Sequence, residues 1–267
     1  MRGASKLSFP KPSLLCHLFD TLVKPVAEYG SEIWGHAHAE ELEIIHRKFC
    51  KFALGLPRTT TNLACYGELG RYPLVIRRKV QMIKFWLRVH SDWTVSPLVK
   101  DACSLATNSS LPWANFIKRI LDSTGLSYVW LNPAIVDPQQ ICTDLAERLT
   151  DQYKQNWQSD LRETTGKLRT YKLIKKEFKS ESYLDLPPHM RVPVARLRTS
   201  THPLRIEIGR YNLPTPIPAE ERYCWFCQNS LVEDECHFLF DCSLYDTTQE
   251  KSALLNYCSL LNPAFPT

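Results

Sequence analysis

Apolar residues recur along most of this chain at the three-to-four-residue spacing of an amphipathic helix, not at the alternating spacing of a strand. Four long helices are predicted from this spacing, over residues 13–34, 40–54, 74–90 and 139–163. Shorter helices are expected between residues 91 and 133. Proline is plentiful, with 18 residues, and glycine is scarce, with 9. This balance favours helices separated by proline-marked turns, so the predicted fold class is mainly α, a helical body with a small C-terminal module.

Details of the pattern predict where the helices break and what they expose. Pro25 is expected to kink or end the first helix, whose apolar stripe includes Leu14, Leu18, Leu22 and Val26. Residues 65–73 contain two glycines and are expected to form a turn. His46 has no ligand-type partner at helical spacing and is expected on the surface. Trp86 is expected in the core.

The breaks between helices predict three regions. Residues 132–138 form a proline-marked break, which makes a domain boundary there plausible. We therefore expect a helical region over residues 1–133, a long helix with a basic connector over 134–211, and a finger-like module with its tail over 212–267.

Four residues near the C-terminus have the spacing of a metal site. Cys224, Cys227, His237 and Cys242 form the pattern Cys-x2-Cys-x9-His-x4-Cys. Thiolate and imidazole ligands at such spacing are typical of one tetrahedral Zn²⁺. Four protein ligands leave no position for water or substrate, so the predicted role of the zinc is structural. The intervening Phe238, Leu239 and Phe240 are expected to pack on Trp225 and Phe226 as an apolar cap.

Other interpretations of these cysteines stay open. Cys236 is an alternative third ligand in place of His237. Free cysteines are also often plain buried residues, and two of them would form a disulfide in an oxidising compartment. In a regular helix, residues five apart point about 140° away from each other, so His237 and Cys242 are expected to straddle a turn or a helix start.

Charge adds a second functional hypothesis. The net charge is +5, and basic residues gather over 166–179 and again over 191–210. Such clusters can bind the phosphates of RNA or DNA, and arginine suits phosphate by its planar guanidinium. The alternative is a solvated helix face. The candidate nucleic-acid-binding residues are Lys167, Arg169, Lys172, Lys175, Lys176, Arg196, Arg198 and Arg205.

The sequence also limits the compartment and the chemistry. No run approaches the roughly 18 apolar residues of a membrane span. Ten cysteines without a visible secretory signal indicate a reducing setting, and we expect an intracellular protein of the nucleus or cytoplasm. No phosphate-binding glycine loop, His-Glu-x-x-His or Gly-x-Ser-x-Gly motif is present. No catalytic site is therefore predicted.

Several segments resemble the part of LINE-type (non-LTR) retrotransposon reverse transcriptases that follows the polymerase core. They occur in the family's order and span nearly the whole chain. The segments are residues 18–25 (LFDTLVKP), 28–35 (EYGSEIWG), 49–51 (FCK), 66–74 (YGELGRYPL), 197–199 (LRT), 209–211 (GRY), 221–224 (ERYC), 233–238 (EDECHF) and 242–245 (CSLY).

This resemblance implies a thumb-to-C-terminus portion whose finger-bearing tail binds the element's RNA and target DNA and supports target-primed reverse transcription. The family's ligand positions match Cys224, Cys227, His237 and Cys242. The family's paired polymerase aspartates and its endonuclease region are absent, and two-metal catalysis needs such carboxylates. We therefore expect a non-catalytic fragment or degenerate copy, with a reverse transcriptase core in trans as a possible partner. The rival interpretations are a structural or protein-interaction fragment and an inert relic.

Overall fold

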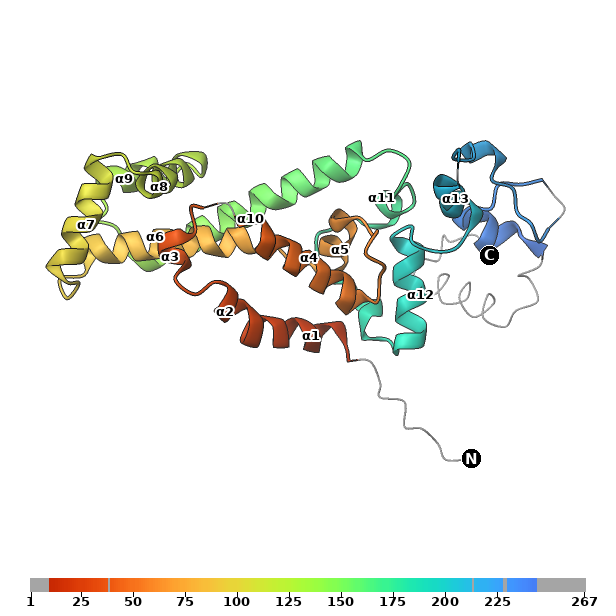
Figure 1. Cartoon of the computed structure of the whole chain (residues 1–267), viewed down its shortest axis with the longest axis horizontal. Coiled ribbons are helices and arrows are strands. Elements are labelled where there is room, and N and C mark those ends of the chain that lie inside the picture. The colour runs from red at the N-terminus through yellow and green to blue at the C-terminus, as the bar shows by residue number, and fades with distance from the viewer. Residues whose placement is uncertain (1–9, 38, 213, 228–229, 244–267) are drawn as a thin grey trace, which may run out of the picture. The chain divides into compact units, whose positions relative to one another are not determined.

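The computed structural model describes residues 10–37, 39–212, 214–227 and 230–243 (Figure 1). Over these residues the chain is mainly helical and contains no β-strand, only two isolated bridges. The predicted fold class, mainly α with a small C-terminal Cys/His module, is confirmed. No helix in these ranges combines the length and the apolar character that crossing a membrane requires.

Contacts divide the chain into two compact units. Residues 1–164 and 175–195 form the first unit, and residues 165–174 and 196–267 form the second. The predicted boundary at 133/134 falls inside the first unit, because residues on both sides of it share one apolar cluster. The predicted boundary at 211/212 falls inside the second unit. The chain thus leaves the first unit after residue 164, returns to it at 175 and leaves it again after 195.

Most helices belong to the first unit, whose last helix, α12, ends in the second. They are α1 (Pro12–Leu18), π-helix η1 (Phe19–Val23), α2 (Lys24–Ala27), α3 (Ser31–Trp34), α4 (Glu40–Leu54), α5 (Asn62–Leu69), α6 (Leu74–Ser91), α7 (Pro97–Asn108), α8 (Pro112–Ser123), α9 (Ser127–Leu131), α10 (Pro138–Glu163), 3-10 helix η2 (Ser182–Asp185) and α12 (Pro188–Arg198). The predicted helices over 40–54, 74–90 and 139–163 correspond to α4, α6 and α10.

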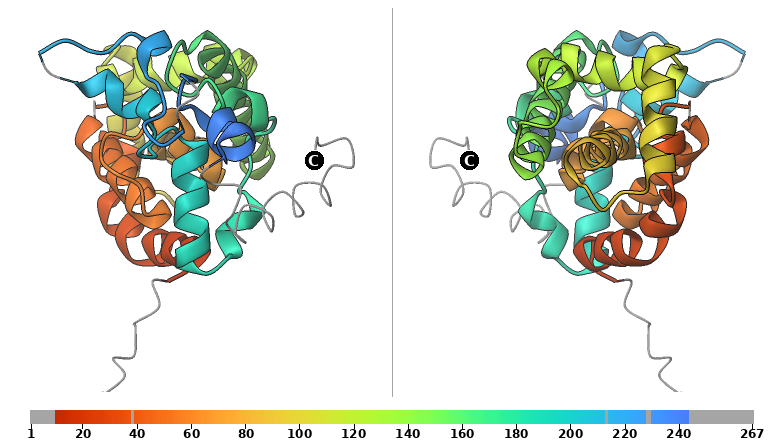
Figure 2. Two further views of the ribbon diagram at one scale, coloured as in Figure 1. Left: turned by 90° about the vertical axis from the view of Figure 1, so that its right-hand side faces the viewer. Right: turned by 90° about the vertical axis from the view of Figure 1, so that its left-hand side faces the viewer.

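The main core of the first unit forms around α6, which is seen nearly end-on in the right-hand view of Figure 2. Its buried residues Ile83, Trp86 and Leu87 pack with residues of α8, α9 and α10, among them Leu121 and Leu145. Trp86 stacks on Trp130 with ring centroids 5.2 Å apart. The prediction that Trp86 belongs to the core is confirmed.

A second apolar cluster joins α4 and α5 to residues that follow 175 in the chain. The predicted turn over 65–73 is wrong in its first half, since α5 continues through Gly67 and ends at Leu69. Gly70 then adopts φ 61°, and a Cβ there would lie 2.6 Å from the backbone nitrogen of Ser180. Glycine is required because the returning segment passes directly against the chain, where Leu69 and Ser180 form a bridge.

The N-terminal half differs from expectation in two places. Within the predicted helix over 13–34, α1, η1 and α2 follow one another without a gap, so the helix does not end at Pro25. It ends after Ala27 instead, and Gly30, whose φ is 69°, separates it from α3. Its apolar stripe is exposed, whereas Phe19 on another side is buried. His46 is fully buried, because α5 and the residues after it cover that side of α4.

The second unit contains shorter elements held by side-chain bonds. They are α11 (Tyr171–Ile174), α13 (Arg205–Ile208), the 3-10 helices η3 (Gly209–Tyr211) and η4 (Ala219–Glu221), and π-helix η5 (His237–Asp241). The basic stretch over 166–179 is not one helix. Leu168 within it has φ 69°, which interrupts a right-handed helix before α11 begins.

Candidate metal centre

The four predicted ligands lie together in the second unit. One ligand atom from each of Cys224, Cys227, His237 and Cys242 falls within 4.8 Å of all the others, and all four residues are buried. Cys224 Sγ and Cys242 Sγ are 4.0 Å apart, and Cys227 Sγ lies 3.1 Å from His237 Nε2. This group forms a Cys₃His cluster that can hold a metal ion.

The first cysteine pair is positioned by a short antiparallel pairing. Tyr223 and Val232 form an isolated bridge. Cys224 N donates to the carbonyl of Leu231 at 2.9 Å, and Glu233 N donates to the carbonyl of Arg222 at 2.9 Å. These bonds place Cys224 opposite the segment that leads to His237.

The second pair is positioned by a π-helical turn. Cys242 N donates to the carbonyl of His237 at 2.8 Å, an i to i+5 bond. A regular α-helix would point residues five apart in different directions, and the wider π turn brings Cys242 back to the side of His237. The Asp234 carboxylate caps this turn by accepting from His237 N at 2.8 Å. The expectation of an irregular turn between these two ligands is confirmed.

The surroundings distinguish His237 from Cys236 as the third ligand. Cys236 is exposed and lies outside the cluster, whereas His237 is buried with Nε2 directed at Cys227.

Hydrogen bonding around the ligands differs from residue to residue. Phe226 N donates to Cys224 Sγ at 3.4 Å, a bond that stabilises a thiolate. His237 Nδ1 is buried without a hydrogen-bond partner. That nitrogen usually donates to an oxygen when imidazole binds a metal.

The distance between two of the thiol sulfurs is close to that in a tetrahedral zinc site. Two thiolates bound at about 2.3 Å in a tetrahedral site are about 3.8 Å apart. The observed sulfur–sulfur distance of 4.0 Å is close to this value. All four positions are supplied by the protein, so an ion held here has no open position for a substrate. None of the described cysteines forms a disulfide.

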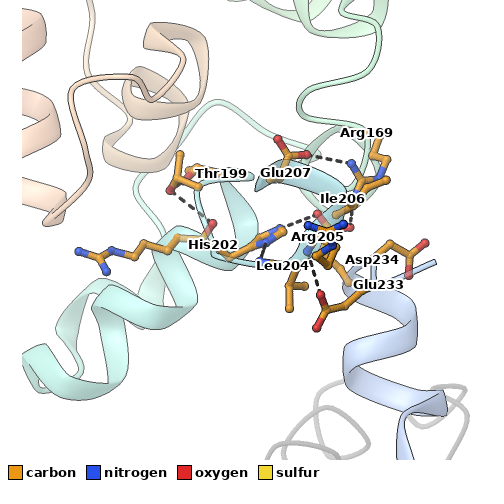
Figure 3. A network of polar contacts seen from close by, with 12 residues as sticks. Arg169, Thr199, His202, Leu204, Arg205, Ile206, Glu207, Glu233 and Asp234 are labelled. Carbon is orange, nitrogen blue, oxygen red and sulfur yellow. Dashed lines mark hydrogen bonds and ion pairs between the residues drawn. The ribbon is translucent and has the colours of Figure 1, made fainter. Parts of the chain in front are cut away.

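A buried polar network supports the metal cluster from residues far away in sequence (Figure 3). Leu204 N donates to His202 Nδ1 at 3.3 Å, so His202 Nε2 carries the proton and donates to Glu235 at 2.8 Å. Arg169 forms ion pairs with both Glu235 and Glu207. Burial alone would raise the pKa of Glu235, but the bond from His202 and the charge of Arg169 lower this pKa to about 2. The network fixes the segment just before His237.

Further bonds connect the segment before η5 with the start of α13. Glu233 accepts from Arg205 N at 2.9 Å through its side chain, and its own carbonyl accepts from Ile206 N at 3.1 Å. The buried Arg222 guanidinium donates to the carbonyls of Ile206 and Ile217. The three consecutive acidic residues Glu233, Asp234 and Glu235 therefore have structural roles, as acceptors for backbone N–H groups and as an ion-pair partner of Arg169.

The eight candidate nucleic-acid residues have different environments. Lys175 and Lys176 belong to the first unit and the other six to the second. The Lys175 side chain is fully buried, donates to the Lys179 carbonyl at 2.7 Å and pairs with Glu181, so it cannot reach a phosphate from outside. The charge of Arg169 is balanced by two carboxylates. The other six differ in exposure. The exposed ones are Lys172, Lys176 and Arg196, and the partly buried ones are Lys167, Arg198 and Arg205.

The aromatic residues of the expected apolar cap are largely exposed. Trp225 is 72% exposed and Phe226 is 57% exposed, so the residues of η5 do not bury either ring. The Arg205 guanidinium lies 3.9 Å from the centroid of the Trp225 ring. The exposure of Trp225 and Phe226 could have been predicted from the cysteine spacing. A Cys-x2-Cys turn that directs both thiolates inward leaves the two middle residues facing outward.

A scan against protein-family models and searches of curated proteins and of solved structures give no match to this chain. The retrotransposon resemblance and the nucleic-acid role therefore stay predictions.

Proposed function

We propose that this chain is a non-catalytic binder of single-stranded RNA or DNA whose C-terminal module is held together by one structural Zn²⁺. The observation that carries the proposal is the exposed pair Trp225 and Phe226 between two metal-ligand cysteines. Exposed aromatic rings beside an arginine provide a stacking surface for bases, and stacking is worth about 1–3 kcal/mol per base. Lys172 and Arg196 of the same unit are exposed and add positive charge for phosphates.

Zinc is proposed as the metal because three thiolates and one imidazole suit it better than magnesium or calcium, which prefer oxygen ligands. The ion would fix the Trp225 turn and η5 in one arrangement. On the sequence resemblance we extend the proposal to a portion of a non-LTR retrotransposon reverse transcriptase protein that does not itself polymerise. Its free or metal-bound thiols suit a reducing compartment, the nucleus or cytoplasm.

The metal is tested by elemental analysis of the purified chain. We expect about one zinc per chain, lost in Cys227→Ser and in His237→Ala, because each change removes one of four ligands. Cys236→Ser is the matched control, since that thiol is exposed and outside the cluster, and it should keep its zinc. Iron or no metal in the folded parent, or zinc lost equally from the control, would contradict the assignment.

Binding is tested by fluorescence anisotropy with labelled single-stranded RNA and DNA over a range of salt concentrations. Trp225→Ala should weaken binding on the order of ten-fold through loss of stacking. Trp93→Ala is the control, because Trp93 is an 88% exposed tryptophan of the first unit. Absence of binding at low salt, or an equal effect of both variants, would refute the stacking surface.

A protein partner is the rival, and the same observation favours it. Exposed tryptophan and arginine are also frequent energetic centres of protein interfaces. The two cases differ in salt dependence, because binding to nucleic acid releases counterions and weakens steeply as salt rises.

A further inference from the structure

A second basic surface lies in the first unit and contains none of the residues assigned above. It is a groove of about 490 Å³ formed by α4 and by the segment that leads to α5. Four cationic side chains line it, and none of the described residues that line it carries a carboxylate. These side chains belong to Arg47, Lys48, Lys51 and Arg58.

Most of this charge is not balanced. Arg47 pairs with Glu40 about two turns earlier on the same helix. Among the described residues no carboxylate forms an ion pair with Lys48, Lys51 or Arg58. The groove therefore concentrates about three uncompensated positive charges in a small volume, which attracts anions.

The groove is built by specific backbone contacts. Gly55 adopts φ 68° at the end of α4 and turns the chain back along the helix. Lys51 Nζ donates to the Arg58 carbonyl at 2.9 Å, and Thr60 Oγ1 donates to the Pro57 carbonyl at 2.8 Å. The loop that carries Arg58 is thereby held beside α4.

An aromatic ring lies among these cations. Phe52 is 56% exposed and lines the groove together with Ile44 and Asn62. A bare inorganic anion would gain nothing from an exposed ring. A single-stranded polynucleotide uses both features, since its phosphates bind cations and its unpaired bases stack on aromatic faces.

We propose that this groove binds a single-stranded segment of nucleic acid, with Lys48, Lys51 and Arg58 on its phosphates and one base against Phe52. This site goes beyond the proposed function, which rests on Trp225 in the other unit. The groove contact and the Trp225 contact can each exist without the other, so each is tested with its own set of variants.

The test measures binding of a labelled single-stranded RNA of about 20 nucleotides by the full zinc-loaded chain at several salt concentrations. The triple variant Lys48→Ala/Lys51→Ala/Arg58→Ala should lower affinity and make the log–log salt slope less negative by about 2, at about 0.7 per phosphate contact. Phe52→Ala should weaken binding on the order of ten-fold and leave the slope unchanged.

The matched control removes three exposed cations of the first unit outside the groove, in Lys84→Ala/Lys118→Ala/Arg162→Ala. It has the same net charge as the triple groove variant and should bind like the parent. The double variant Lys48→Ala/Arg58→Ala replaces the triple one if circular dichroism shows that the latter unfolds, with a slope change of about 1.4.

A second readout locates the contact. Photocrosslinking with 4-thiouridine RNA should label peptides from residues 40–62, and this labelling should persist in Trp225→Ala. An unchanged slope in the groove variants, an equal change in the control, or crosslinks confined to the second unit would overturn the proposal. So would binding to vesicles of anionic phospholipid without binding to RNA.

Discussion

The stability of the first unit should depend on pH through one buried histidine. His46 is fully buried, and Arg71 donates from Nε to His46 Nε2 at 3.1 Å. Arg71 is itself held by two bonds to Asp20, at 2.8 and 3.0 Å. The Tyr66 hydroxyl lies 3.5 Å from His46 Nδ1. Protonation would place an N–H group of His46 against the Arg71 N–H, so the folded protein requires a neutral imidazole.

The direction and the size of this pH dependence follow from the pKa of His46. Burial first, and then the positive charges of Arg71 and Lys24, lower the pKa of His46 from 6.5 to about 3. Between these two values the unfolded chain binds a proton that the folded chain does not. The stabilisation is therefore complete above pH 6.5 and is lost as the pH falls, by up to about 1.4 kcal/mol per pH unit. Integrated from pH 7 to pH 5, the loss due to His46 is about 2 kcal/mol.

The assay is urea unfolding followed by tryptophan fluorescence at pH 7, 6 and 5. Six of the seven tryptophans precede residue 165, so the signal reports mainly on the first unit. His46→Gln keeps a side-chain hydrogen-bond acceptor but does not titrate. The parent should lose about 2 kcal/mol more than this variant between pH 7 and pH 5. His189→Gln removes an exposed histidine and should follow the parent.

Equal losses in the parent and in His46→Gln would refute the reasoning. They would mean that His46 becomes protonated in the folded state at an ordinary pKa, which is incompatible with a buried imidazole that accepts from Arg71. All other histidines are common to both proteins, so their contributions cancel in the comparison.

Two further predictions concern backbone contacts of the first unit. The Glu43 carboxylate accepts from the first two amides of α6 and pairs with a buried arginine. Glu43→Ala should therefore lower the free energy of unfolding by about 3–5 kcal/mol, as measured by urea unfolding. The matched control Glu41→Ala removes an exposed carboxylate and should change this free energy by no more than about 0.5 kcal/mol. Gly70→Ala should lower the melting temperature more than Gly30→Ala. Both glycines have positive φ, but a Cβ meets the Ser180 nitrogen at 2.6 Å in the first case and no atom closer than 3.7 Å in the second. Equal melting temperatures for the two variants would show that the close approach of Ser180 to Gly70 does not cause the loss of stability.

Helix positions were predictable where the pattern is long and its ends are marked. α4 begins with acidic residues and ends at a left-handed glycine, and its observed bounds, Glu40–Leu54, match the prediction. The basic stretch over 166–179 shows the limit, because its apolar spacing is helical and yet Leu168 adopts φ 69°. Packing within the second unit, where Leu168 is fully buried, outweighed the local preference.

The sequence by itself determined the helical class and the four residues of the Cys₃His cluster. Both depend on residues close together in the chain, where spacing and turn geometry are local properties. Only the tertiary structure decided which groups are covered. It buried His46 and Lys175, exposed Trp225, and assembled the network around Glu235 from segments more than sixty residues apart, such as that of Arg169. Burial and ion pairing depend on what a distant segment places against a side chain, and one sequence does not state those contacts.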